Sequence, residues 1–182
     1  MRHQAAGARR VVIHDPNGER DWAACGVIVT DRAELARAMG ARAWVVVWRG
    51  AMGARSEAEA AEAFEWGNRC ALAAGDALIL WDEVDRFTTP GRLPPFAYEM
   101  VNAGRHRGLR VFAASRRVRR VSRDLSANAG RIMVARMTEP GDLAWIKATM
   151  GDGAARAVPT LPPFHFLDWR ETEARVKKAP FR

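Results

Sequence analysis

The sequence predicts an α/β fold built on a mainly parallel β-sheet. Short apolar, β-branched runs alternate along the chain with segments of helical periodicity, which favours parallel strands joined by crossover helices. The run Leu78–Trp81 is apolar at every position, as is typical of a strand covered on both faces of such a sheet. The 182 residues are the length of one domain, and no internal repeat interrupts them.

The expected strands are recognised by apolar, β-branched residues bounded by turn residues. The first strand ends in Asp15, Pro16, Asn17 and Gly18, each of which is a common turn former. The expected strands cover residues 11–13, 25–30, 43–48, 77–81, 109–115 and 131–137, with 161–169 as an edge strand or an extended arm.

Capping residues and glycines bound the expected helices. Thr30 or Asp31 can begin a helix that Gly40 ends. Ser56, followed three residues later by Glu59, is a capping box at the start of a long helix that runs to about residue 74. Further helices are expected at residues 96–104, 123–127 and 140–150.

The composition excludes several classes of protein. Apolar residues make up 48% and charged residues 27%, and no apolar stretch is long enough to span a membrane. Residues 1–9 are expected to be a disordered lead-in and lack the apolar segment of a signal peptide, so we expect a cytoplasmic protein. Cys25 and Cys70 do not suggest a disulfide framework, and the histidines have no ligand-spaced partners.

The positive charge is concentrated in one segment. The chain carries a net charge of +8, and residues 105–136 contain ten arginines against the single acid Asp124. Arginine binds phosphate oxygens bidentately, so we expect a phosphate backbone as partner rather than stacked bases, because Phe112 is the one aromatic residue there. The alternative is that these arginines reflect only the arginine-rich composition of the chain and lie on its surface without a partner role. The nucleic-acid-binding candidates are Arg116, Arg117, Arg119, Arg120 and Arg123.

Two adjacent carboxylates follow the apolar run. Asp82 and Glu83 stand where a parallel strand ends, which is the edge at which such sheets bind ligands. A pair of this kind can hold a magnesium ion with the first carboxylate and activate water with the second. Asp15 follows another strand end and is a further cofactor-binding candidate, with a turn role as its alternative. The alternative for the pair is a strand that ends in solvated acids.

In order, these segments resemble a known family. ALILWDEVD, a helix ending in NAGRHRG, LRVFAAS running into SRRVRRVSRDLSANAG, RIMVARM and EPGDLAWI resemble the HerA/FtsK group of DNA-pumping ATPases. The resemblance is strongest to short phage and plasmid members, the packaging-type and zonula-occludens-toxin-like proteins. It implies a partial RecA-like (ASCE) P-loop NTPase core at residues 10–150 and a C-terminal arm at 151–182.

The resemblance also implies roles for individual residues. Asp82, at the end of the Walker B strand, would coordinate Mg²⁺ and Glu83 would activate water, while Ser115 would sense the γ-phosphate of ATP. Arg105 or Arg107 would be an arginine finger offered to a neighbouring subunit. The implied partners are DNA and further copies of the chain, with hexameric rings as the rule among the relatives.

One motif of the family is missing. A P-loop requires GxxxxGK[ST], and this chain contains no such string, since its first lysine is Lys147. The absent strand would lie between those expected at 109–115 and 131–137, so we expect a gap or a rearranged sheet there. A fragment of a longer ATPase, a degenerate ATPase, or another element filling the gap would each explain this.

The missing motif shapes the expected function. We expect an ATPase-fold component of a DNA translocation or packaging machine that has no appreciable ATP hydrolysis as this chain alone. A non-catalytic nucleic-acid-binding or assembly module that keeps the fold is the alternative, and a metal-dependent nuclease is a weaker one.

Overall fold

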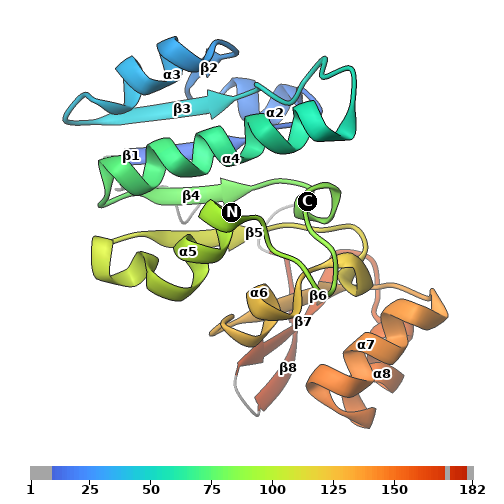
Figure 1. Ribbon diagram of the computed structural model, residues 1–182. Coiled ribbons are helices and arrows are strands. Elements are labelled where there is room, and N and C mark those ends of the chain that lie inside the picture. Colours follow the sequence, from blue (N-terminus) through green and yellow to red (C-terminus); the bar gives the residue numbers. More distant parts are fainter. Residues whose placement is uncertain (1–9, 171–172, 180–182) are drawn as a thin grey trace.

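A five-stranded parallel sheet organises the first two thirds of the chain (Figure 1). The computed structural model describes residues 10–170 and 173–179, so the expected lead-in lies outside the described residues. The strand order is β2-β3-β1-β4-β5, and every pair is parallel, as the sequence predicts. The strands are β1 (Arg10–His14), β2 (Val27–Val29), β3 (Trp44–Trp48), β4 (Leu78–Trp81) and β5 (Arg110–Ala113).

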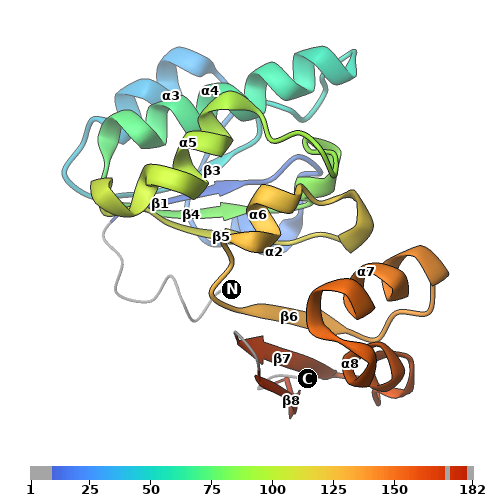
Figure 2. The ribbon, with the colours of Figure 1, turned by 60° about the horizontal axis from the view of Figure 1, so that its bottom comes forward.

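Helices cover both faces of this sheet unequally. Three helices, α3 (Arg32–Met39), α4 (Glu57–Ala74) and α5 (Pro95–Ala103), lie together on one face (Figure 2). The short helix α2 (Arg20–Ala23) belongs to the other face, where its Trp22 packs against the apolar cluster of β1, β3 and β4. All four residues of β4 are buried, as expected for a strand with neighbours on both sides.

The predicted caps set the helix boundaries. Asp31 accepts a hydrogen bond from the Glu34 N–H (2.9 Å) at the start of α3. Ser56 accepts one from the Glu59 N–H (3.1 Å) at the start of α4, and the Glu59 carboxylate accepts one from the Arg55 N–H (2.8 Å). These bonds satisfy N–H groups that the first turn of a helix leaves without a partner.

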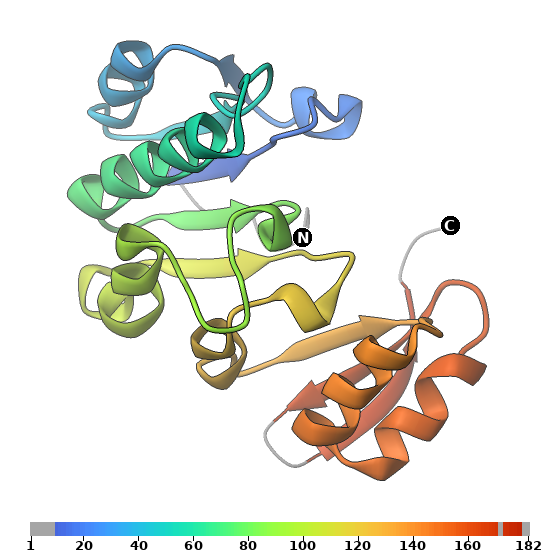
Figure 3. The same cartoon turned by 45° about the vertical axis from the view of Figure 1, so that its right-hand side comes forward.

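The last part of the chain forms a second, antiparallel sheet with its own small core. Its strand order is β6-β7-β8, and the helices that follow β6 pack on one of its faces (Figure 3). Val134, Leu167 and Ile146 are buried between the sheet and these helices. Its elements are β6 (Ile132–Ala135), α7 (Pro140–Met150), α8 (Asp152–Ala157), β7 (His165–Arg170) and β8 (Glu173–Lys178). Helix α6 (Arg123–Ala127) precedes them, and its Leu125 packs against the core of the parallel sheet.

Four short 3₁₀ helices complete the described elements. They are η1 (Val84–Arg86), η2 (Gly104–Arg107), η3 (Val118–Arg120) and η4 (Val158–Thr160).

The prediction of an edge strand or arm at 161–169 is wrong, because β7 is the central strand and β8, whose residues are all exposed, pairs along its outer side. Strand β6 pairs with β7 and not with β5, so β5 is an edge of the parallel sheet. The sheet is therefore open between β5 and β6, which is one of the two outcomes expected from the missing strand.

Candidate functional site

The acid pair lies at the carboxyl end of β4, where backbone hydrogen bonds fix its position. The Asp82 N–H donates to the carbonyl of His14 (3.1 Å), and the Val84 N–H donates to the carbonyl of Ala114 (2.9 Å). Glu83, between them, has left-handed backbone angles of φ 49° and ψ 47°. This conformation costs a non-glycine residue about 1 kcal/mol and turns the chain sharply out of the strand.

Each carboxylate of the pair already has a partner. The indole Nε1 of Trp22 donates to Oδ2 of Asp82 at 2.8 Å, while the Glu83 N–H donates to Oδ1 at 3.1 Å. The carboxylate of Glu83 forms an ion pair with Arg116. The Glu83 side chain is 12% exposed, whereas that of Arg116 is 76% exposed. Arg116 thus contacts the candidate base from the solvent side.

These residues line one pocket of about 320 Å³, which we call the acidic pocket. It brings together Asp82, Glu83 and Ser115, the three residues expected to act on ATP within one chain. The Ser115 Oγ accepts the Arg117 N–H (3.0 Å), which leaves the hydroxyl hydrogen free to donate. The complete lining is Glu19, Asp82, Glu83, Ala114, Ser115 and Arg116.

Sequence reasoning missed Glu19 and Trp22 at this site. Both belong to the segment of α2, which has four residues and is too short to display a helical period. The only local signal is the turn formed by residues 15–18, which predicts that the chain reverses there but does not indicate a contact with Asp82.

The acidic pocket does not hold a metal ion by protein groups alone. In the part of the chain that the structure describes, no three or more His, Cys, Asp or Glu side chains are arranged to do so. Proteins commonly bind Mg²⁺ through one or two carboxylates together with phosphate oxygens and water. Asp82 therefore fits the ion only jointly with a phosphate-bearing ligand.

Asp15 has the contacts of a structural turn residue. It is fully buried, and its Oδ2 accepts a hydrogen bond from Arg49 Nε at 2.8 Å. Its Oδ1 accepts the N–H groups of Gly18 (2.9 Å) and Glu19 (3.0 Å). Asp15 does not line the acidic pocket but holds the turn that carries Glu19 towards it. Its cofactor role stays a prediction.

The two candidates for the arginine finger lie at the opposite end of the strands from the acid pair. Arg105 and Arg107 are part of η2, and the carbonyl of Arg107 accepts the N–H of Asp76 at 2.8 Å. Asp76 precedes β4, whereas Asp82 follows it, so the length of the strand separates these arginines from the acid pair. Within one copy of the chain, Arg105 and Arg107 therefore do not reach the acidic pocket.

The basic segment is partly neutralised within the chain. Arg117 donates to the buried carboxylate of Asp142 (3.3 Å), and Arg119 lies 3.8 Å from Glu139. The Arg119 N–H also donates to Asp142 (3.1 Å). Arg120 and Arg123 are exposed and form no ion pair within the described residues. A role of these arginines in nucleic-acid binding stays a prediction.

A buried histidine lies at the end of the strand next to the acid pair. His14 is 3% exposed, and its ring meets Phe64 edge-on with 5.1 Å between ring centroids. Burial lowers the pKa of His14 to about 3, so its imidazole is neutral near pH 7. Within the described residues its Nε2 has no hydrogen-bond partner.

The parallel sheet, with an acid pair after an interior strand and a serine after the next strand, agrees with the RecA-like P-loop NTPase fold that the sequence resemblance implies. Solved structures confirm this fold. The chain is similar to the genome packaging NTPase B204 from Sulfolobus turreted icosahedral virus 2 in complex with ATP-γS, with a TM-score of 0.77 and 20% identity over 99% of this chain and 87% of that chain.

Two further structures are similar. B204, the DNA-packaging ATPase from Sulfolobus turreted icosahedral virus, gives a TM-score of 0.75 and 20% identity over 99% of this chain and 87% of that chain. The N-terminal domain of zonular occludens toxin from Neisseria meningitidis gives 0.45 and 13% over 97% and 78%, an overlap too loose to support an argument. No protein-family model and no curated protein matches the sequence. The similarity to packaging-type ATPases is confirmed at the level of the fold.

None of the described helices is both long and apolar enough to cross a bilayer.

Proposed function

We propose that the chain is an ATPase-fold component of a DNA translocation or packaging machine. The observation that carries this proposal is the convergence of Asp82, Glu83 and Ser115 on one pocket at the carboxyl edge of the parallel sheet. The B204 structures with the same fold are those of a genome packaging NTPase, and one of them holds an ATP analogue.

Each pocket residue has a role in this proposal. Mg²⁺, when bound with a nucleotide, would offset the charge of the phosphates, and Asp82 would help to hold it. Ser115 would donate its hydroxyl hydrogen to a phosphate oxygen. Glu83 would accept a proton from the attacking water, but only after Arg116 has moved away, because a paired carboxylate is a weaker base.

We further propose that this chain alone does not hydrolyse ATP at an appreciable rate. The lining of the acidic pocket has three carboxylates, Glu19, Asp82 and Glu83, and its single cation, Arg116, is paired with one of them. A triphosphate would meet net repulsion there. The sequence has no GxxxxGK[ST] motif, whose backbone N–H groups and lysine would reverse this balance.

The proposal includes assembly into a homo-oligomeric ring. Arg105 and Arg107 lie at the edge opposite to the acid pair, so either could reach a pocket only in a neighbouring copy. The arginine finger of one copy would then add a cation to the site of the next, which would still lack the phosphate-binding loop.

Steady-state ATP turnover tests the hydrolysis proposal. The unmodified chain, with Mg²⁺ and with or without duplex DNA, is expected to remain at background. Glu83→Gln is expected to give the same rate, and Glu62→Gln, at an exposed glutamate paired with Arg32, serves as the control. A robust turnover that Glu83→Gln abolishes and Glu62→Gln preserves would overturn the proposal.

The second candidate function is a non-catalytic nucleic-acid-binding or assembly module. It is favoured by the two contacts that occupy the acid pair, Trp22 on Asp82 and Arg116 on Glu83. Salt-dependent binding of duplex DNA that neither ATP nor Mg²⁺ changes would support this candidate, whereas tighter binding with Mg·ATP would favour the first.

A further inference from the structure

The antiparallel sheet has one face that none of the described helices covers. Helices α7 and α8 pack on the face of Val134 and Leu167 (Figure 2). The register places Asp168 opposite Met133 and Arg175, so these three residues share the other face, where Met133 is 52% exposed. We call this the open face. It comprises Arg131, which directly precedes β6, with Met133, Phe166, Asp168, Arg170, Glu173, Arg175 and Lys177.

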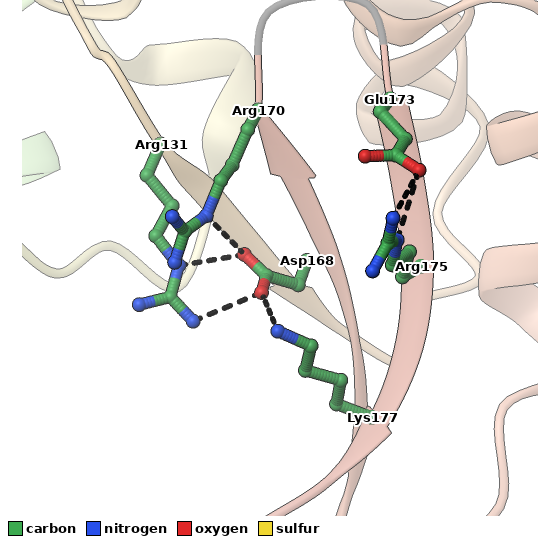
Figure 4. Close-up of polar contacts among 6 residues, drawn as sticks. All are labelled: Arg131, Asp168, Arg170, Glu173, Arg175 and Lys177. Atoms are coloured by element: carbon green, nitrogen blue, oxygen red, sulfur yellow. Dashed lines mark hydrogen bonds and ion pairs between the residues drawn. The ribbon is translucent and has the colours of Figure 1, made fainter.

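Asp168 gathers three cations at the centre of the open face (Figure 4). Arg131 holds it with two hydrogen bonds, from Nε to Oδ1 (2.6 Å) and from Nη2 to Oδ2 (3.0 Å). Lys177 Nζ donates to Oδ2 at 2.6 Å, and Arg170 Nε lies 3.9 Å from Oδ1. The bonds from Arg131, followed by that from Lys177, lower the pKa of Asp168 to about 2. We call these four residues the Asp168 cluster.

The Asp168 cluster carries an excess of positive charge. Three cations around one carboxylate leave a net charge of +2, while the nearby pair Arg175 and Glu173 is neutral. The arginines 117 and 119, in contrast, face two carboxylates, those of Glu139 and Asp142. The local excess of positive charge is therefore larger in the Asp168 cluster than around Arg117 and Arg119.

The cations of the Asp168 cluster can still bind a ligand. The side chains of Arg131, Arg170 and Lys177 are 34%, 60% and 44% exposed. A guanidinium has five N–H donors and an ammonium three, and Asp168 occupies only two of Arg131 and one of Lys177. Asp168 is nearly buried and orients these groups without using up their donors.

We propose that the open face binds the phosphate backbone of double-stranded DNA through Arg131, Arg170 and Lys177. The inference rests on the DNA-handling role proposed above and assigns it a surface. The cations come from three separate segments, the residue before β6, the end of β7 and β8, which suits successive phosphates of a backbone better than one small anion. The one aromatic ring on the described open face, Phe166, is half-buried, so stacking with single-stranded bases is not favoured.

Fluorescence anisotropy with a labelled duplex of about 30 base pairs tests this surface, with NaCl varied from about 50 to about 200 mM. The variant Arg170→Gln/Lys177→Gln removes two cations and leaves Arg131 bonded to Asp168. It is expected to bind about tenfold more weakly and to lower the salt slope by about two, because each lost phosphate contact releases about one counterion fewer.

Two matched variants make the result specific. Arg32→Gln/Arg55→Gln removes the same charge from exposed ion pairs at α3 and next to α4, and is expected to keep the affinity within about twofold. Arg170→Lys/Lys177→Arg keeps the charge of the open face and is also expected to bind within about twofold. Circular dichroism and the unfolding midpoint verify that all variants are folded.

The outcomes separate the surface from the function on which it rests. If the unmodified chain does not bind the duplex, the DNA-handling role and the open face both fail. If it binds, but Arg170→Gln/Lys177→Gln behaves like Arg32→Gln/Arg55→Gln, the open face alone fails and the DNA-handling role stands.

Discussion

The acidic pocket and the Asp168 cluster are built from the same groups in opposite proportions. The pocket has three carboxylates and one cation, and the cluster has one carboxylate and three cations. The pocket therefore attracts cations and repels phosphates, while the cluster attracts phosphates. The excess negative charge thus lies at the parallel sheet and the excess positive charge at the antiparallel sheet, and the acidic pocket lacks the cations that would bind a phosphate.

The partners of the central carboxylates differ as well. Asp82 accepts a hydrogen bond from the neutral indole of Trp22 and forms no ion pair within the described residues. Asp168 is bound by Arg131 and Lys177. A carboxylate held by a neutral donor can still recruit a cation, whereas one surrounded by cations serves to position them.

The largest expected effect concerns the separate cores beneath the two regions. Phe64, stacked on Phe87 with 4.5 Å between ring centroids, is buried in the parallel-sheet core, and Phe64→Ala should lower the free energy of unfolding by about 3–5 kcal/mol. Ile146→Ala, in the other core, should lower it by about 2–4 kcal/mol.

Urea denaturation measures both changes, and hydrogen exchange shows which sheet opens. Exchange in Ile146→Ala is expected to rise first in β6–β8. If hydrogen exchange in this variant rose equally in β1–β5, the two sheets would open as one cooperative unit, which would contradict the separation of the two cores.

Acid should destabilise the parallel sheet and the antiparallel sheet in different pH ranges. His14 has a pKa of about 3 when folded and about 6.5 when unfolded, so between these values the unfolded state binds a proton that the folded state does not. The free energy of unfolding should therefore fall by about 2 kcal/mol from pH 7 to pH 5. Urea titrations at several pH values measure this, and His14→Gln should flatten the slope. Identical slopes would refute the assignment to His14.

Asp168 should respond only at lower pH. Its folded pKa of about 2 lies below the unfolded value of about 3.9, so its contribution is present above pH 4 and is lost as the pH falls towards 2. At pH 7, Asp168→Asn should cost about 1–2 kcal/mol, a modest value because its cations are partly exposed.

The matched control for that variant is Asp152→Asn. Asp152 pairs with Lys147 at 3.0 Å on the surface, and the change should have a much smaller effect. Equal losses in the two variants, measured by urea denaturation, would show that the Asp168 cluster is an ordinary surface contact.

The smallest change in stability is expected for Arg116→Gln. Because Arg116 is mostly exposed, its loss should change the free energy of unfolding by less than about 0.5 kcal/mol. It removes the sole cation of the acidic pocket, so the loose electrostatic attraction of Mn²⁺ to its three carboxylates, which needs no coordination site and is followed by electron paramagnetic resonance, should strengthen by about threefold or more. Arg120→Gln is the control, and equal Mn²⁺ affinity in both variants would contradict the charge balance of the pocket.

The sequence predicts most of the parallel sheet and part of the candidate site. The order of apolar runs and caps was sufficient for β1–β5 and their main helices, since period and capping are local properties. Asp82, Glu83 and Ser115 could be expected at one edge because parallel strands end there. Trp22 could not, because its contact with Asp82 spans 60 residues and depends on a short helix without a pattern.

Charge counted along the chain gave an incomplete account of the basic surface. Arginines 117 and 119 belong to a segment with a single acid, but their partners Glu139 and Asp142 lie beyond that segment. The Asp168 cluster joins Arg131 to β7 and β8, and β8 is a polar strand that hydrophobic periodicity does not reveal. Register, rather than proximity in sequence, decides which charges meet.

A chain with this fold, an acidic pocket and no phosphate-binding loop should bind nucleotide very weakly. Isothermal titration calorimetry with Mg·ATP-γS measures this directly on the unmodified chain and on Asp82→Asn. We expect no saturable binding below about 1 mM for either. Micromolar binding to the unmodified chain that Asp82→Asn abolishes would contradict the account, because it would show that the acidic pocket holds a triphosphate without further help.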